Sequence, residues 1–209
     1  LIEIAYCLRH LPAAQKVKTI IEKETLGLIN SVIVEVGEYL PDWRPEIDYK
    51  DSVSAQKSLG GGVLLELSHE LDYLNWFFGP FKKVFCDLEN TNTLDIDVED
   101  RVDAILKNKS FVVNLHMDFL QRDPSRVCKI IGTKGSLLWN IKENSVSIRY
   151  PKGRKEKILD EPKFDKNKMY SDMILRFFEV SQKKAKPIVG LEDSIYVMSL
   201  IEAMRLSSE

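Results

Sequence analysis

The sequence lacks the features that mark several classes of protein. It has no apolar run long enough to cross a bilayer, and it does not open on the charged and hydrophobic segments of a secretion signal. Its 30 Lys and Arg residues are balanced by 32 Asp and Glu residues, and nucleic-acid binding usually requires a basic excess. We therefore expect a soluble chain with no membrane partner and no nucleic-acid partner.

Cysteine is scarce and shows no pairing pattern. Cys7, Cys86 and Cys128 are odd in number and far apart, and each lies in an apolar segment that resembles a strand. A disulfide framework or a zinc site would place cysteines in closer, repeated spacings. The pattern instead favours buried free thiols in a reducing compartment. We expect a cytoplasmic protein with no metal site.

No G-x-G-x-x-G motif occurs, so the sequence has no dinucleotide-binding fingerprint. The GTKG segment, residues 132–135, lies between two strand-like segments and is typical of a hairpin turn. The chain does have the material for one sizeable core, because 44% of its residues are hydrophobic. We expect residues 1–209 to form a single domain.

Hydrophobic periodicity predicts an α+β fold. Helical spacing indicates helices over 12–24, 62–78, 167–183 and 191–206. Strand-like segments cover 2–8, 28–40, 82–89, 98–108, 110–121, 126–132, 135–141 and 145–150. The last six are joined by short turns and must pair antiparallel. The prediction is a largely antiparallel, open-faced sheet with helices packed on one face.

The second face of this sheet is expected to contact another copy of the chain. We assign to that outer face the apolar residues Val102, Ala104, Leu106, Val112 and Leu120. A sheet covered by helices on one side needs cover on the other side when that side is apolar. We therefore predict a homo-oligomer that associates through the sheet.

The stretch GGGVLLELSHELDYLNWFFG, residues 60–79, contains one histidine, His69. A helical wheel places His69 opposite the main apolar arc, with Leu65, Asp72 and Trp76 near it, so His69 faces a second interface or a pocket. The spacing leaves two interpretations open. His69 is either a hydrogen-bonded packing residue, oriented by Asp72 three positions on, or a catalytic group.

Three segments resemble the second domain of the Gfo/Idh/MocA oxidoreductases. The 60–79 stretch resembles their GGG–(D/E)–H–E–x–D signature. YCLRHLPAAQKVKTII, residues 6–21, resembles their crossing from the cofactor domain, and YLPDWRPEIDYKDSVSAQKSLGGG, residues 39–62, resembles the substrate loop of their sugar dehydrogenases. The resemblance implies that residues 1–10 are the last strand and crossover of a Rossmann domain that this sequence lacks.

The resemblance also implies a function, namely an NAD(P)-dependent oxidoreductase that acts on a sugar or polyol. His69 takes the role of general acid/base, and the candidates for substrate binding are Arg9, Trp43, Arg44, Asp48, Tyr49 and Asp72. NAD or NADP would be bound mainly by the N-terminal domain, so we expect the 209-residue chain alone to be inactive.

One departure from the family pattern concerns Glu66. Many members have an aspartate four residues before the histidine, whereas Glu66 lies three before it and differs in azimuth by about 100° on a helix. We therefore do not expect Glu66 to act as the partner of His69.

The alternative function is a non-catalytic assembly or ligand-binding module of the same fold.

Overall fold

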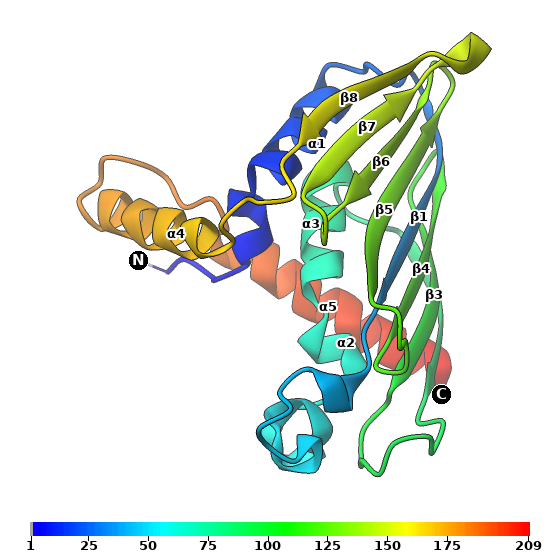
Figure 1. Ribbon diagram of the computed structural model, residues 1–209, viewed down its shortest axis with the longest axis vertical. Coiled ribbons are helices and arrows are strands. Elements are labelled where there is room, and N and C mark those ends of the chain that lie inside the picture. The colour runs from blue at the N-terminus through cyan, green and yellow to red at the C-terminus, as the bar shows by residue number, and fades with distance from the viewer. Residues whose placement is uncertain (1) are drawn as a thin grey trace.

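One sheet of eight strands organises the chain, and the helices lie on one side of it (Figure 1). This computed structural model describes residues 2–209, and Leu1 lies outside the described residues. Across the sheet the strand order is β2-β3-β4-β1-β5-β6-β7-β8. The strands are β1 (Ile29–Gly37), β2 (Lys83–Glu89), β3 (Arg101–Lys107), β4 (Val112–Asp118), β5 (Ser125–Gly132), β6 (Ser136–Asn140), β7 (Ser145–Arg149) and β8 (Lys155–Asp160). The predicted α+β class with a largely antiparallel, open-faced sheet is confirmed.

The first strand interrupts what would otherwise be a simple meander. β1 lies between β4 and β5, parallel to β4 and antiparallel to β5. Every other pair of neighbours is antiparallel, as expected for strands joined by short turns. Val32, Val34 and Val36 of β1 are at most 5% exposed. The central position of β1 therefore buries these three valines, and the C-terminal end of β1 lies beside the start of β5.

The helices are α1 (Pro12–Glu22), α2 (Val63–Glu66), α3 (His69–Phe78), α4 (Asn167–Ser181) and α5 (Leu191–Ser208). They match the predicted helices with one difference. The helix predicted over 62–78 is broken at Leu67 and Ser68, where the Ser68 and Glu70 amides bond to carbonyls three residues back. As a result, His69 is the first residue of α3 rather than a residue inside one long helix. No helix in the described part of the chain is long and apolar enough to cross a membrane.

Two sequence assignments of strands were inaccurate. The strand predicted over 2–8 is wrong, because residues 2–6 have no regular structure and Cys7–His10 form a 3-10 helix, η1. This segment lies against the loop before α5, where the Ile4 amide donates to the Val189 carbonyl at 3.3 Å, and no strand pairs with it. Conversely, β8 was not predicted, since its largely charged sequence, KEKILD, does not alternate. It forms by pairing with β7 at the sheet edge.

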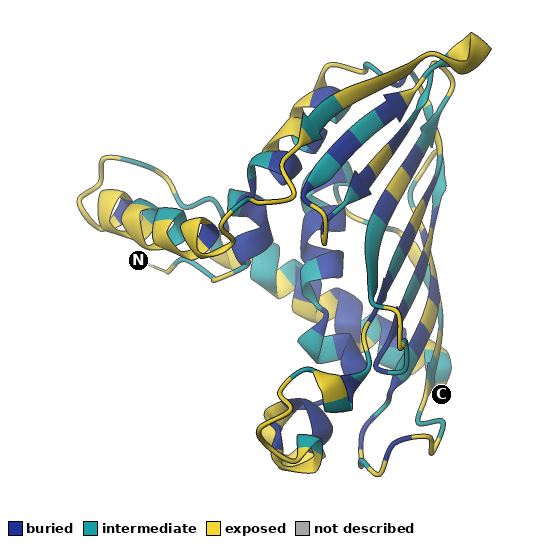
Figure 2. Ribbon diagram, viewed as in Figure 1, coloured by how far each residue is buried: buried dark blue, intermediate teal, exposed yellow. Residues whose placement is uncertain are grey.

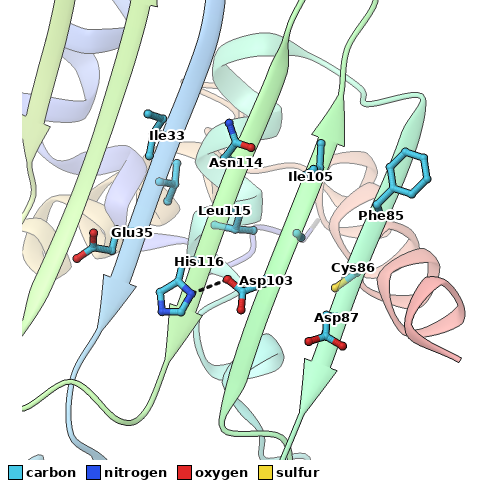
Figure 3. Close-up of a pocket in the computed structure, with 12 residues that line it drawn as sticks. Ile33, Glu35, Phe85, Cys86, Asp87, Asp103, Ile105, Asn114, Leu115 and His116 are labelled. Atoms are coloured by element: carbon cyan, nitrogen blue, oxygen red, sulfur yellow. Dashed lines mark hydrogen bonds and ion pairs between the residues drawn. The ribbon is translucent and has the colours of Figure 1, made fainter.

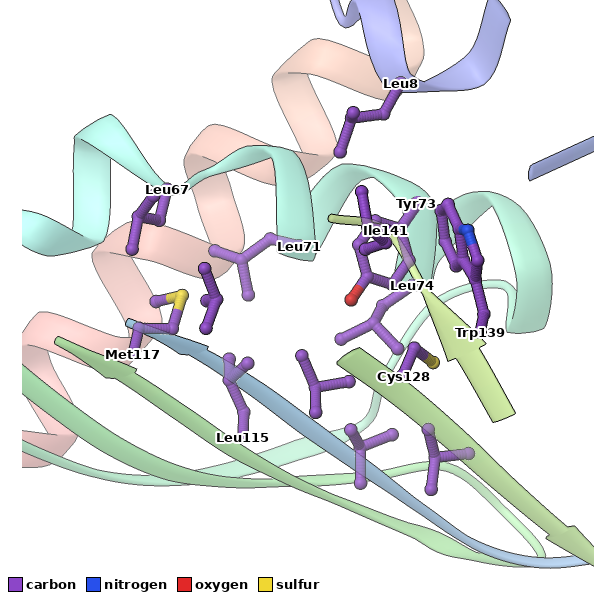
Figure 4. Close-up of a cluster of buried hydrophobic side chains, with 14 of the residues drawn as sticks. Leu8, Leu67, Leu71, Tyr73, Leu74, Leu115, Met117, Cys128, Trp139 and Ile141 are labelled. Atoms are coloured by element: carbon purple, nitrogen blue, oxygen red, sulfur yellow. The ribbon is translucent and has the colours of Figure 1, made fainter. Parts of the chain in front are cut away.

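Burial alternates along the central strands, and the core lies between the sheet and α3 (Figures 2 and 4). Val113, Leu115 and Met117 of β4 point inward and are at most 2% exposed. On the helix side, Leu71 and Leu74 of α3 are fully buried. The core therefore fixes α3 against the sheet through one face of the helix.

The assignment of Val102, Ala104 and Leu106 to the outer face was wrong. Val102 pairs with Met117 and Leu106 with Val113, so period-two alternation turns all three into the core. They are 0%, 6% and 0% exposed. The apolar residues that the sheet does expose lie on different positions: Ile33, Phe85, Ile105 and Leu138.

Candidate functional site

The candidate site is a pocket of about 450 Å³ at the N-terminal end of α3, which we call the His69 pocket. It lies where η1, the end of β1, the start of β5 and the start of α4 meet, and its volume is typical of small-molecule sites. Its wall combines apolar side chains with polar ones, of which six matter here: Trp43, Glu66, His69, Arg126, Lys142 and Asn144. The fold thus brings residues from distant parts of the sequence around His69.

His69 is held in the pocket by packing, and its side chain makes no hydrogen bond to any of residues 2–209. Its Nδ1 is buried without a partner, and the ring lies edge-on to Tyr6 with centroids 5.4 Å apart. Burial, aided by the positive charge of Arg126, lowers the pKa of His69 to about 4. The imidazole is therefore neutral at physiological pH, which leaves it able to accept a proton.

Asp72 does not orient His69, contrary to one of the two sequence interpretations. Both carboxylate oxygens of Asp72 accept from Arg9, at 2.9 Å from Nε and 2.7 Å from Nη2. Arg9 also donates to the Ile188 carbonyl and to Asp193. Burial raises the pKa of Asp72 to about 6, an effect that Arg9 opposes, so the carboxylate is still ionised at neutral pH.

The Arg9–Asp72 pair lies in a buried environment, as structural ion pairs do. The two side chains are 2% and 1% exposed, and neither residue lines the His69 pocket. Arg9 also lies over the ring of Trp76, 5.4 Å from its centroid. The pair joins η1 to α3 and, through Asp193, to α5. Contact of Arg9 or Asp72 with a substrate stays a prediction.

Of the four candidates in the 41–62 loop, only Trp43 reaches the His69 pocket. Its ring packs edge-on against Phe119, and its Nε1 is buried without a partner. Arg44 and Tyr49 line a smaller neighbouring hollow, and the exposed Asp48 accepts from the Lys50 amide. Substrate contact by Arg44, Asp48 and Tyr49 therefore also stays a prediction.

The sequence did not indicate Asn144 or Arg126 as site residues, and it argued against a role for Glu66, yet all three line the pocket. Glu66 lines the pocket and accepts from the Ser54 hydroxyl at 3.0 Å. Asn144 is 4% exposed, its Oδ1 is buried without a partner, and it occupies a left-handed turn (φ 49°) before β7. Arg126, on β5, pairs with the fully buried Glu70. Nothing in the sequence near Asn144 or Arg126 links either residue to His69, because the sheet makes that connection.

Close packing explains Gly61 and Gly62, and a left-handed φ of +80° explains Gly60; the three glycines do not form a phosphate-binding turn. They connect a 3-10 turn, η5 (Lys57–Leu59), to α2 and follow no strand. A Cβ on Gly61 would lie 2.4 Å from the Val53 carbonyl oxygen. The first amides of α2 already donate to Glu99, from Val63 to its carbonyl and from Leu64 to its carboxylate. The residues at this motif therefore do not fit a dinucleotide.

Comparisons with known proteins agree with the fold. A sequence model described as the GFO/IDH/MocA C-terminal domain matches residues 14–138. No curated protein sequence gave a significant match. Among solved structures, levoglucosan dehydrogenase in complex with NADH aligns over 100% of this chain and 64% of its own, with 17% identity and a TM-score of 0.86.

Two further structures are similar. The complex of levoglucosan dehydrogenase with NADH and levoglucosan covers 100% of this chain and 64% of its own, at 18% identity and a TM-score of 0.85. An inositol dehydrogenase homologue from Azotobacter vinelandii, complexed with NAD+, covers 99% and 62%, at 13% identity and a TM-score of 0.82. This chain thus spans less than two thirds of the length of these structures, and at such identity the likeness shows the fold alone.

Proposed function

Because the chain belongs to the GFO/IDH/MocA C-terminal domain family, we propose that it is the substrate-binding and oligomerisation part of an NAD(P)-dependent oxidoreductase. The substrate in this proposal is a sugar or polyol whose hydroxyl or keto group reacts. His69 acts as the general acid/base. One observation carries the proposal: a neutral, hydrogen-bond-free imidazole on the wall of a pocket of about 450 Å³.

The pocket has the polar groups that a hydroxylated ligand needs. Trp43 Nε1 is a buried donor without a partner, and Asn144 Oδ1 is a buried acceptor without one. Both atoms are shielded from solvent in this structure, so the groups that a bound hydroxyl can reach are the charged side chains that line the open pocket, Glu66, Arg126 and Lys142. The indole of Trp43 also offers an aromatic face for a sugar ring. These groups support a polyol or sugar more than an apolar ligand.

The cofactor in this proposal is NAD or NADP, which accepts or supplies the hydride. Two similar structures are complexes with NADH and NAD+. Since the triple-glycine motif does not fit a dinucleotide, the proposal assigns the cofactor mainly to another domain of the complete polypeptide. It follows that the 209-residue chain alone should bind none of the four nicotinamide dinucleotides at micromolar concentration in calorimetric titrations, and tight binding would contradict this assignment.

Replacing His69 tests the role of this residue. In the polypeptide that contains both domains, His69→Asn should lower kcat by about two to four orders of magnitude, the usual contribution of a positioned acid/base, with cofactor affinity retained. The measurement is kcat together with the melting temperature on one preparation. A loss of stability with unchanged kcat per folded molecule would identify His69 as a packing residue and favour the non-catalytic module instead.

The outer face of the sheet supports the oligomerisation part of the proposal. Figure 3 shows a shallow groove on this face, where Ile33, Ile105 and Phe85 project between polar side chains. Ile33, Ile105 and Phe85 are 41%, 44% and 62% exposed. Apolar side chains grouped on an uncovered sheet face are typical of contact surfaces. We assign this face to a second copy of the chain.

A further inference from the structure

Arg126 has an unused hydrogen-bonding edge in the His69 pocket. Its Nε and Nη2 donate to the two carboxylate oxygens of Glu70, at 2.8 and 3.0 Å, and Nη1 has no hydrogen-bond partner among residues 2–209. The Glu70 side chain is 0% exposed and that of Arg126 is 27% exposed. A guanidinium carries five N–H donors in a fixed fork, so the pair with Glu70 leaves donors free on the side that lines the pocket.

The position of Arg126 is fixed from the same helix that presents His69. Glu70 follows His69 directly in the first turn of α3. Glu70 accepts from Nε and Nη2 of the guanidinium, while His69 lines the pocket. The bidentate geometry restricts rotation of the guanidinium. Arg126 is also near enough to His69 for its charge to lower the pKa of the imidazole. The two side chains therefore form one preorganised unit.

The other titratable groups around His69 come from several elements. They are Tyr6 and Cys7 near η1, Glu38 after β1, Glu66 on α2, Lys142 after β6, and Lys166 and Tyr170 at α4. Lys142 and Lys166 are exposed, and Glu66 accepts from the Ser54 hydroxyl. Among the cations that the described residues place on the pocket wall, only Arg126 pairs with a buried carboxylate.

We propose that Arg126 is a further substrate-binding residue, whose free guanidinium edge donates hydrogen bonds to the substrate oxygen that exchanges its proton with His69. The inference rests on the proposed function. When the substrate O–H bond breaks, the proton forms an N–H bond on the imidazole and negative charge develops on the oxygen. Fixed donors aimed at that oxygen stabilise the charge without reorganisation. Burial, with a smaller contribution from the charge of Arg126, keeps His69 in the unprotonated form that receives the proton.

Two substitutions at Arg126 separate these effects in the two-domain polypeptide. Arg126→Lys keeps the charge but loses the fork, so kcat/KM should fall about 100-fold, with the pKa of His69 unchanged. Arg126→Gln removes the charge as well, so the pKa of His69 should rise by about one unit. The acid limb of the kcat/KM profile and an NMR titration of the imidazole both measure this pKa. Variants at His10 and His116 assign the three histidine signals. Arg149→Gln, which removes an exposed arginine from β7 outside the pocket, should change neither quantity.

The outcomes are distinguishable. Wild-type kcat/KM in folded Arg126→Lys would overturn the inference, as would a lower melting temperature with unchanged kcat/KM per folded molecule and an unmoved pH profile. If the Arg126→Gln variant fails to fold because Glu70 is left unpaired, the kcat/KM of the Arg126→Lys variant alone tests the inference. A wild-type polypeptide that oxidises and reduces no sugar or polyol would instead overturn the proposed function, whatever the effect of Arg126 on the His69 titration.

Discussion

Single side chains of this chain acquire their chemistry from burial and from one or two neighbours. His69 and His116 are the same residue type with opposite environments. Burial and Arg126 lower the pKa of His69 to about 4, whereas hydrogen bonds to Asp118 and Asp103 raise the pKa of His116 to about 9. At neutral pH the pocket histidine is therefore uncharged and the sheet-face histidine is charged. Only the first is in the form that accepts a proton.

Replacing Asp72 distinguishes a structural role of this residue from a role in substrate binding. Asp72→Ala should destabilise the fold by about 3 kcal/mol, because it leaves the 2%-exposed Arg9 side chain without its main partner. In the two-domain polypeptide, kcat/KM per folded molecule should also fall if Asp72 contacts the substrate, as the family resemblance predicts, and should stay close to wild type if the role of Asp72 is structural alone. Urea denaturation and steady-state kinetics measure the two quantities.

The exposed Lys50–Asp95 pair is the matched control for this change. Lys50→Gln breaks an ion pair in the loop that carries Tyr49, yet solvent screens it and no measurable loss of stability is expected. A large loss of kcat/KM in Asp72→Ala without loss of stability would contradict the structural role and place Asp72 in the substrate site.

At the scale of elements, the break between α2 and α3 determines what His69 can do. A continuous helix over 62–78 would place His69 in a helix interior, with turns on both sides. The break makes it the first residue of α3 and lets Glu66, the last residue of α2, line the same pocket. The glycines before α2 are part of this arrangement, because the loop passes close to the chain at Val53 and Ser54.

Gly61→Ala should therefore cost more than Gly60→Ala. A Cβ at position 61 would lie 2.4 and 2.7 Å from two backbone carbonyl oxygens, which cannot rotate away, so we expect a loss of about 2 kcal/mol or more. At Gly60 a Cβ would meet nothing within 4 Å, and only the left-handed φ of +80° is unfavourable, at about 1 kcal/mol. Equal losses in urea unfolding would show that backbone conformation, and not close packing, explains the motif.

At the scale of the whole molecule, helices cover one face of the sheet and leave the other face open. On the open face, His116 lies opposite Asp103 across β3 and β4, and the apolar groove runs beside this pair (Figure 3). Such a surface combines an apolar centre with fixed charges, as many contact surfaces between subunits do. The assignment of this face to a second copy can be tested directly.

Phe85→Asp should shift the chain from dimer or larger assembly to monomer in light scattering at tens of micromolar. The change places a carboxylate in the apolar groove, where association would have to desolvate it. Leu175→Asp is the matched control, because Leu175 is 61% exposed on α4, away from the sheet, while Phe85 is 62% exposed. A monomeric wild-type chain, or a Phe85 variant that assembles as the wild type does, would contradict the assignment.

The sequence by itself determined the class of fold and pointed to His69 as the candidate catalytic residue. Alternation in β4 and helical spacing in α1, α4 and α5 predicted those elements, since both patterns reflect which side of one local element faces the core. The glycine–histidine stretch and its family resemblance singled out His69. The charged β8 shows no alternation and was therefore not predicted, whereas the apolar pattern of residues 2–8 predicted a strand that does not form.

Only the tertiary structure decided what surrounds His69. Arg126 and Asn144 are more than 50 residues away from it in sequence, and they reach the pocket because β5 starts beside the end of β1 and the turn before β7 lies near it. Asp72, which one of the two sequence interpretations placed beside the imidazole, pairs with Arg9 instead, because η1 packs on α3. Hydrogen bonds between distant segments depend on distances across the fold, and a one-dimensional spacing does not contain those distances.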